Sequence, residues 1–213
     1  MAKAIAKELG YRYIDSGAMY RAVTLFIQRH DVSFEQLESM TPVQINAMLE
    51  HIQITFHINP ETSFSEVFLN DINVEKNIRN LSVSDWVSPV SAIPEIRHKM
   101  VAQQQSYGRQ KGIVMDGRDI GTSVFPDAEL KIFMTARKEI RAKRRFDELN
   151  QKGFMVTIDE VLKNIEERDF TDTHRSESPL RKADDAVVLD NSNLTEQQQL
   201  DFAMRLVQKA LNE

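Results

Sequence analysis

The chain has 213 residues, of which 41% are hydrophobic and 28% charged, and its net charge is −5. This size and composition suit a globular protein with one large domain, or with a core and a smaller insert. The absence of cysteine excludes disulfides and thiolate metal sites, and no apolar run approaches the roughly 20 residues that span a bilayer. The acidic balance argues against a general nucleic-acid binder, so we expect a cytoplasmic protein with no nucleic-acid or membrane partner.

The first half of the chain mixes helices with one segment of period two. The expected elements are a helix over 1–9, a strand over 11–14, a helix over 16–29, a helix beginning at Thr41–Pro42, and a strand with a following hairpin over 52–75. Gly10 is a C-terminal stop for the first helix, and no residue caps the start of that helix. Apolar residues alternate from Ile52 to Ile58, so we expect a small antiparallel insert there.

In the second half, short apolar strands alternate with helices. The expected elements are helices near 75–92 and 95–108, strands over 113–115 and 130–134, helices over 137–150 and 157–170, a strand over 186–189, and a final helix capped by Thr195. This alternation predicts an α/β fold with a parallel sheet and helices on both faces. Ligands of such folds sit at the carboxyl ends of the strands, here at 15–17, 116–119 and 135–137.

The first of these strand ends is followed by DSGAMYR at 15–21. Ser16 lies at a helix start, where free backbone N–H groups favour an anion, and Arg21 could reach the same anion one turn further on. Plain helix capping by Asp15 or Ser16, with Arg21 in solvent, is the simpler interpretation of this segment alone.

The second strand end is followed by DGRDIGT at 116–122. Asp116 and Asp119 bracket Arg118, and the two glycines permit a tight backbone path. The carboxylates could hold a ribose, a metal shell or a base amino group, and Arg118 could clamp a phosphate. The alternative is a salt-bridged turn.

A third charged segment covers residues 167–175. Arg168 and Arg175 are separated by two helical turns if the helix continues, or lie at two points of a flexible lid if the helix breaks at Thr171. A solvated charged face is the alternative interpretation.

Together, the three segments resemble cytidylate kinase of the bacterial type, in the P-loop nucleoside monophosphate kinase family. The matching segments are DSGAMYR at 15–21, VSPVSAIPEIR at 87–97, DGRDIGTSVFPDA at 116–128, KIF at 131–133 and ERDFTDTHRSESPL at 167–180. The resemblance covers essentially the whole chain. It implies transfer of a phosphoryl group from ATP, with Mg²⁺, to CMP or dCMP by a monomer.

The resemblance also implies a role for each matching residue. By position, Ser16 and Arg21 bind the acceptor nucleotide; Ser88, Arg97 and Asp119 read cytosine; Arg118 contacts the CMP phosphate; Asp116 lies near the transfer centre; and Arg168, Asp172 and Arg175 touch ribose and phosphates from a lid. The catalytic residues are then Arg118, Asp116, Arg168 and Arg175, and no protein metal ligand is expected. The chemistry fits, because the cytosine amino group donates to a carboxylate and the ring acceptors receive bonds from arginine.

One departure from the family pattern concerns the ATP site. The family begins with a strand and a glycine-rich loop ending in Lys-Ser/Thr, but no GxxxxGK[ST] occurs here, and the opening helix corresponds to the one after that loop. No ATP-binding residue is therefore assigned. We expect a P-loop kinase fold without its first strand, which would lie between the strands at 113–115 and 130–134, and an inactive chain.

The domain organisation follows from the same resemblance. It implies a core α/β domain over 1–30, 108–150 and 183–213, a CMP-binding domain over 31–107 with the antiparallel insert, and a lid over 151–182. Rival interpretations are a kinase of the same fold for UMP or AMP, a non-catalytic CMP-binding protein, and an RNA binder that uses the arginine cluster at 137–145. The acidic balance and the lack of aromatic residues beside that cluster count against the RNA binder.

Overall fold

The computed structural model describes residues 1–62 and 64–212. The α-helices are α1 (Ala2–Leu9), α2 (Ser16–Arg29), α3 (Phe34–Ser39), α4 (Pro42–Glu50), α5 (Leu81–Val90), α6 (Pro94–Gly108), α7 (Lys138–Gln151), α8 (Ile158–His174) and α9 (Glu196–Leu211). The strands are β1 (Arg12–Asp15), β2 (Ile54–Ile58), β3 (Ser65–Leu69), β4 (Ile72–Asn73), β5 (Ile113–Asp116), β6 (Ile132–Thr135) and β7 (Val187–Asp190). A short 3₁₀ helix, η1 (Asn77–Arg79), precedes α5, and a one-turn π-helix, η2 (Ile120–Val124), follows β5.

The strands form three separate small sheets. β1 pairs with β5 in parallel, with Asp15 opposite Asp116, and β6 pairs with β7 in parallel. β2, β3 and β4 form an antiparallel sheet. The chain is therefore an α/β protein with parallel sheets and helices. Within the described residues β5 pairs only with β1 and β6 only with β7, so the parallel strands are divided between β5 and β6, the two strands between which the absent first strand was expected to lie.

Local sequence explains how several elements begin and end. Gly10 ends α1 in the left-handed conformation with a φ of 65°, as predicted. Thr195 and Gln198 form the predicted capping box of α9. The turn between β3 and β4 places Asn70 and Asp71 at φ values of 49° and 63°, the conformation of a tight hairpin turn.

Other element predictions need correction. The helix expected near 75–92 is interrupted, because Asn80 ends η1 and caps α5 through a side-chain bond from the Val83 backbone N–H. The helix expected to end at Phe170 continues to His174, so no break occurs at Thr171. Helix α3, which Ser33 caps, was not predicted.

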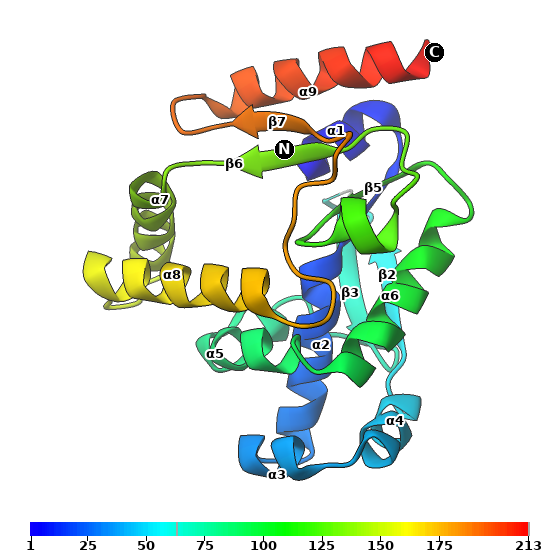
Figure 1. Cartoon of the computed structure of the whole chain (residues 1–213), viewed down its shortest axis with the longest axis vertical. Helices are drawn as coiled ribbons and strands as arrows, with labels where there is room; N and C mark the ends of the chain where they lie inside the picture. Colours follow the sequence, from blue (N-terminus) through cyan, green and yellow to red (C-terminus); the bar gives the residue numbers. More distant parts are fainter. Residues whose placement is uncertain (63, 213) are drawn as a thin grey trace.

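Most of the hydrophobic core surrounds α2, which runs through the body of the protein (Figure 1). Its buried neighbours come from α3, α4, α5, α6 and the antiparallel sheet. A second cluster joins α1 and α9, and Val114 of β5 and Ile132 of β6 both pack against it. A third cluster lies between α7 and α8, which project from the body as a pair (Figure 1). The α7–α8 pair therefore has a small core of its own.

The antiparallel sheet offers a test of this packing. Ile54 is fully buried, whereas Ile58 on the same strand is 64% exposed. We expect Ile54→Ala to lower the free energy of unfolding by about 2–5 kcal/mol, because it leaves a cavity in the main core. Ile58→Ala should change it by less than about 0.5 kcal/mol. Urea denaturation of both variants measures the difference, and equal effects would contradict the assigned burial.

Candidate functional site

The paired ends of β1 and β5 bring two carboxylates together. Asp15 and Asp116 are opposite each other in the strand register. Tyr13 donates a hydrogen bond of 2.9 Å to Asp116, and the Ser16 hydroxyl donates one of 2.6 Å to the Asp116 backbone carbonyl. One side of Asp116 faces solvent, but protein atoms crowd the rest of the carboxyl. This partial burial, together with the Asp15 charge, raises the pKa of Asp116.

The close approach of these strand ends depends on Gly117. A Cβ atom at this position would lie 2.2 Å from the Ser16 hydroxyl oxygen, which is a clash. Glycine therefore allows the backbone after β5 to meet the start of α2. This contact fixes the DGRD segment against the DSGA segment.

Helix α2 carries Arg21 into a group of positive charges. Arg21 donates hydrogen bonds of 2.8 Å to the Ser84 hydroxyl and 3.4 Å to the Ile78 carbonyl. Burial and the nearby charges of Arg168 and Arg79 lower the pKa of Arg21 to about 10. Burial and the Arg118 charge likewise lower the pKa of Arg168. Guanidinium groups held this close repel one another, and a bound anion would relieve the repulsion.

A buried network of ion pairs adjoins this group. Arg97 pairs with Asp119, and the two residues are 1% and 5% exposed. Arg175 lies 3.8 Å from Asp119 and 3.3 Å from Asp172, so it links the two carboxylates. Asp172 also accepts a bond of 2.9 Å from Arg118. The network thus ties α6, the turn after β5 and the end of α8 together.

Most of the predicted site residues meet in this region. Ser16 contacts Asp116. A continuous chain of ion pairs runs through Arg97, Asp119, Arg175, Asp172 and Arg118. Arg21 and Arg168 lie near enough for their charges to repel each other, and this repulsion contributes to the lowered pKa of Arg21.

Ser88 is the exception among the predicted residues. It lies half-buried on α5, where its backbone carbonyl accepts a bond of 2.8 Å from the Ser91 hydroxyl. Within the described residues, its side chain makes no hydrogen bond to another member of the predicted set.

Sequence reasoning missed several residues at the site. Arg79 pairs with Asp15 at 2.8 Å and with Glu75 at 3.0 Å. Tyr13 holds Asp116, and the Arg97 guanidinium lies 5.5 Å from the Tyr20 ring centre. Tyr13 and Tyr20 fall inside or beside the DSGAMYR segment, so proximity to it was an available signal. Arg79 had no such signal, because Asp15, the partner that joins it to the site, is distant in the chain.

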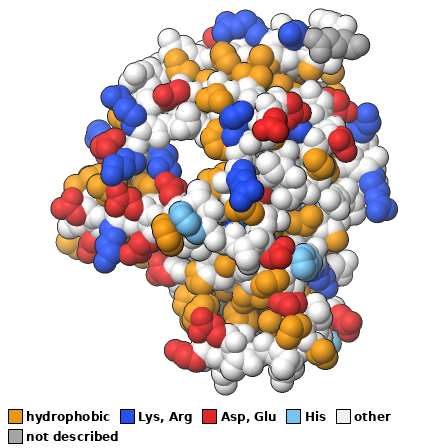
Figure 2. Space-filling view, in the orientation of Figure 1, with side chains coloured by type: hydrophobic (Ala, Val, Ile, Leu, Met, Phe, Trp, Pro, Cys, Tyr) orange, Lys and Arg blue, Asp and Glu red, His pale blue; other side chains and the backbone are white. Residues whose placement is uncertain are grey.

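The surface between the body and the α7–α8 pair is hollowed. Figure 2 shows this hollow, with Lys and Arg side chains gathered on its α7–α8 rim. The described residues contain no group of three or more His, Asp or Glu side chains that could hold a metal ion. No described helix is long and apolar enough to cross a membrane.

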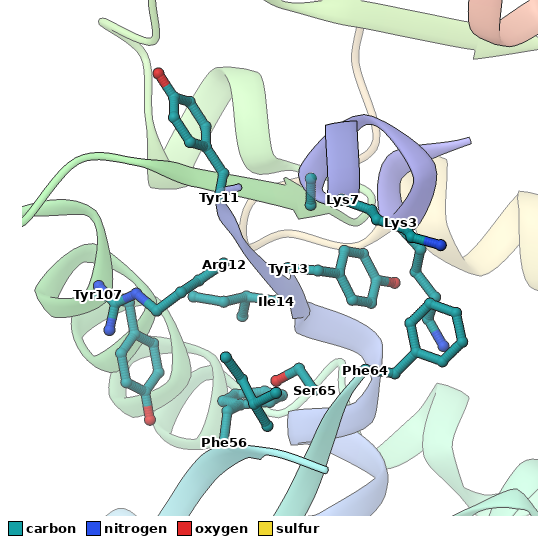
Figure 3. A pocket seen from close by; sticks show the side chains of 12 residues that line it. Lys3, Lys7, Tyr11, Arg12, Tyr13, Ile14, Phe56, Phe64, Ser65 and Tyr107 are labelled. Atoms are coloured by element: carbon teal, nitrogen blue, oxygen red, sulfur yellow. The ribbon is translucent and has the colours of Figure 1, made fainter. Parts of the chain in front are cut away.

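A separate small cavity of about 90 Å³ lies on the other side of β1 (Figure 3). The Lys3 ammonium is 5.4 Å from the Tyr13 ring centre and 5.5 Å from that of Phe64. None of the predicted nucleotide-binding residues lines this cavity. It therefore adjoins the site described above through Tyr13 without including the predicted residues.

The raised pKa of Asp116 gives a pH-dependent prediction. Folding favours the protonated carboxyl, so the stabilisation is present below the ordinary pKa of 3.8 and is lost as the pH rises through the raised value. Asp116→Asn keeps an acceptor for Tyr13 and removes the charge. We expect it to raise the Tm at pH 7 and to raise it less at pH 4. Thermal melts test this, with Asp184→Asn as the control for net charge. A variant less stable than the parent at pH 7 would contradict it.

The buried ion pairs predict a large stability difference between two aspartates. Asp119→Ala leaves the buried Arg97 without its carboxylate, so we expect a loss of about 3–5 kcal/mol in the free energy of unfolding. Asp169→Ala breaks an ion pair with Arg141 in which both side chains are over a third exposed, and should cost about 0–1 kcal/mol. Urea denaturation compares the two variants. A smaller loss for Asp119→Ala than for Asp169→Ala would contradict the network.

Comparison with known proteins identifies the family. The cytidylate kinase family model matches residues 1–209. The chain is 52% identical over 211 residues to the cytidylate kinase of Parabacteroides distasonis, covering 99% of this chain and 91% of that protein. It is 53% identical over 213 residues to that of Bacteroides thetaiotaomicron, covering 100% and 92%, and 51% identical over 207 residues to that of Flavobacterium psychrophilum, covering 97% and 91%. The chain therefore belongs to the cytidylate kinase family of nucleoside monophosphate kinases.

Proposed function

We propose that this chain carries the acceptor half of a kinase active site that phosphorylates CMP or dCMP at the expense of ATP. The observation that carries the proposal is the arginine group around Arg21 and Arg168 beside the buried network around Asp119. The arginine group would bind a phosphate, and the buried network would bind a polar base. A nucleoside monophosphate has both parts, and the family membership makes CMP the acceptor.

Each predicted residue keeps its role in this proposal. Arg21, Arg118 and Arg168 hold the acceptor phosphate and the group being transferred. Ser88, Arg97 and Asp119 read the base. Ser16, Asp172 and Arg175 contact ribose and phosphate, and Asp116 lies near the transferred group. The domains follow the predicted organisation, with 31–107 binding CMP, 151–182 as the lid, and the remainder as the core.

The network suits cytosine better than uracil. Cytosine carries an amino donor at position 4 and an acceptor at N3, whereas uracil carries an acceptor and a donor at these places. An Asp119 carboxylate accepts from the cytosine amino group but repels the uracil carbonyl. Arg97 has a buried Nε with no well-formed hydrogen bond within the described residues, and a cytosine ring acceptor would satisfy such a donor.

In the reaction, a phosphate oxygen of CMP attacks the γ-phosphorus of ATP. The bond from that phosphorus to the bridging oxygen breaks, so CDP forms and ADP leaves. Arginines placed around the acceptor phosphate position it and stabilise the spread negative charge. Mg²⁺ supplied with ATP would neutralise phosphate charge, and the solvent-facing side of the Asp116 carboxyl is the protein group that would help phosphates and water to hold it.

The donor half of the site requires a further element. The sequence contains no glycine-rich loop of the GxxxxGK[ST] type, and β5 and β6 each lack a second strand partner within the described residues. One face of β6 is also partly open to solvent, since Met134 is 42% exposed. Strands of an α/β parallel sheet are normally covered on both faces. We therefore propose that a strand and phosphate loop from outside these 213 residues insert between β5 and β6.

Acceptor selectivity tests the first part of the proposal. We expect calorimetry to show CMP binding about ten- to a hundredfold tighter than UMP, because one repulsive contact replaces one hydrogen bond. Asp119→Asn should reduce this preference, since an amide can donate to the uracil carbonyl. Asp169→Asn is the matched control and should keep the preference. Equal affinity for CMP and UMP in the parent protein would overturn the assignment of the base.

Turnover tests the second part. With ATP, CMP and Mg²⁺, the 213-residue chain should form no ADP above background in a coupled assay. A version extended before Met1 by roughly 20 residues that encode a strand and a GxxxxGK[ST] loop should turn over and melt at a higher temperature. Comparable activity and Tm in the two proteins would refute the inserted strand.

A further inference from the structure

Arg79 is placed at the site by two carboxylates. It ends η1, and its Nη2 atom lies 2.8 Å from Asp15 and 3.0 Å from Glu75, while Nε donates to Glu75 at 3.3 Å. Two partners from different segments fix the guanidinium on one edge. The Nη1 atom makes no hydrogen bond within the described residues, so it is available to a ligand.

The same short segment touches Arg21. The Ile78 carbonyl, one residue before Arg79, accepts from Arg21 Nη1 at 3.4 Å. Asp15 in turn accepts from the Ala18 backbone N–H at the start of α2, the helix that carries Arg21. The Arg21 side chain therefore contacts the backbone beside Arg79, and Asp15 joins Arg79 to the start of the helix that carries Arg21. Their mutual repulsion contributes to the lowered pKa of Arg21.

Two guanidinium groups kept this close are unfavourable unless something compensates them. Asp15 and Glu75 offset the charge of Arg79, and their effect outweighs its burial, so the pKa of Arg79 is raised. No carboxylate forms an ion pair with Arg21 or Arg168 within the described residues. The group as a whole thus keeps a positive excess, which a phosphate dianion could neutralise with charge-assisted bonds.

We propose that Arg79 is a further guanidinium for the acceptor phosphate, presented near Arg21 and held in place by Asp15 and Glu75. The inference rests on the proposed function, because it names a further residue of the CMP site. Arg79 binds the phosphate and makes no contribution to reading the base. Its loss therefore affects ligands that carry a phosphate and spares those that do not.

The experiment compares CMP with cytidine by calorimetry on the 213-residue chain. We expect Arg79→Ala to weaken CMP binding by about tenfold or more and to change cytidine binding by less than about twofold. Arg79→Lys should fall between, because lysine keeps the charge but loses the planar fork. Lys76→Ala removes the same charge from a neighbouring exposed position and should change neither affinity.

The outcomes separate this inference from the proposal on which it rests. Equal weakening of CMP and cytidine by Arg79→Ala would show a purely structural role, and no weakening of CMP would show no role; either result overturns the inference. If Arg79→Ala fails to fold, Arg79→Gln keeps a donor for Asp15 and should show the same loss specific to CMP. A parent chain that binds neither ligand would overturn the proposed function itself and the Arg79 inference with it.

Discussion

The pairing of buried charges is the constraint on which the site depends. Arg97 and Asp119 are almost fully buried, and a buried ion is strongly unfavourable unless it is paired. Because Arg175 and Asp172 extend the pairing, the end of α8 must dock against α6 and the turn after β5. The positions of the proposed lid segment and of the residues proposed to read the base are thus set by the same requirement. Removing one member of such a network is strongly unfavourable, because it leaves a buried charge without a partner.

The group formed by Arg21 and Arg168 brings like charges together, whereas the buried network pairs opposite charges. Arg21 and Arg168 lie close together although burial and mutual repulsion both disfavour their charged forms. Packing around α2 and α8 holds them there, and the fold bears the electrostatic cost before any ligand binds. Preorganised positive charge of this kind is what phosphoryl transfer requires, because little covalent chemistry is asked of the protein.

Local signals were readable from the sequence, and tertiary ones were not. The end of α1 at Gly10, the capping box at Thr195 and the hairpin turn at Asn70 follow from single residues and their near neighbours, so they were predicted. The segments that follow β1 and β5 were also identified, because charged residues after apolar strands point to a ligand site. The continuation of α8 past Phe170 was missed, since threonine is compatible with a helix whose end is held by Asp172.

The contacts of individual side chains lay beyond sequence reasoning. Arg79 gave no signal, because Asp15 is distant in the chain and only the fold brings the two together. Asp119 was predicted to face a base, yet its burial and its pairing with Arg97 also make it a structural residue. Periodicity reports burial but not pairing, so the expectation that β5 and β6 are not neighbours came from the family resemblance and not from the residue pattern.

The separate core of the α7–α8 pair has a mechanical consequence. The pair has its own packed interior around Val161 and Leu149, so as the proposed lid it would move as a rigid body without local unfolding. The ion pairs of Asp172 and Arg175 near the end of α8 would then hold the closed arrangement. In the closed arrangement the charges of Asp172 and Arg175 are buried away from dissolved ions. In an open arrangement they would be solvated and screened by salt. Salt would therefore stabilise the open arrangement and leave the closed one almost unchanged, so that higher ionic strength shifts the balance toward the open arrangement.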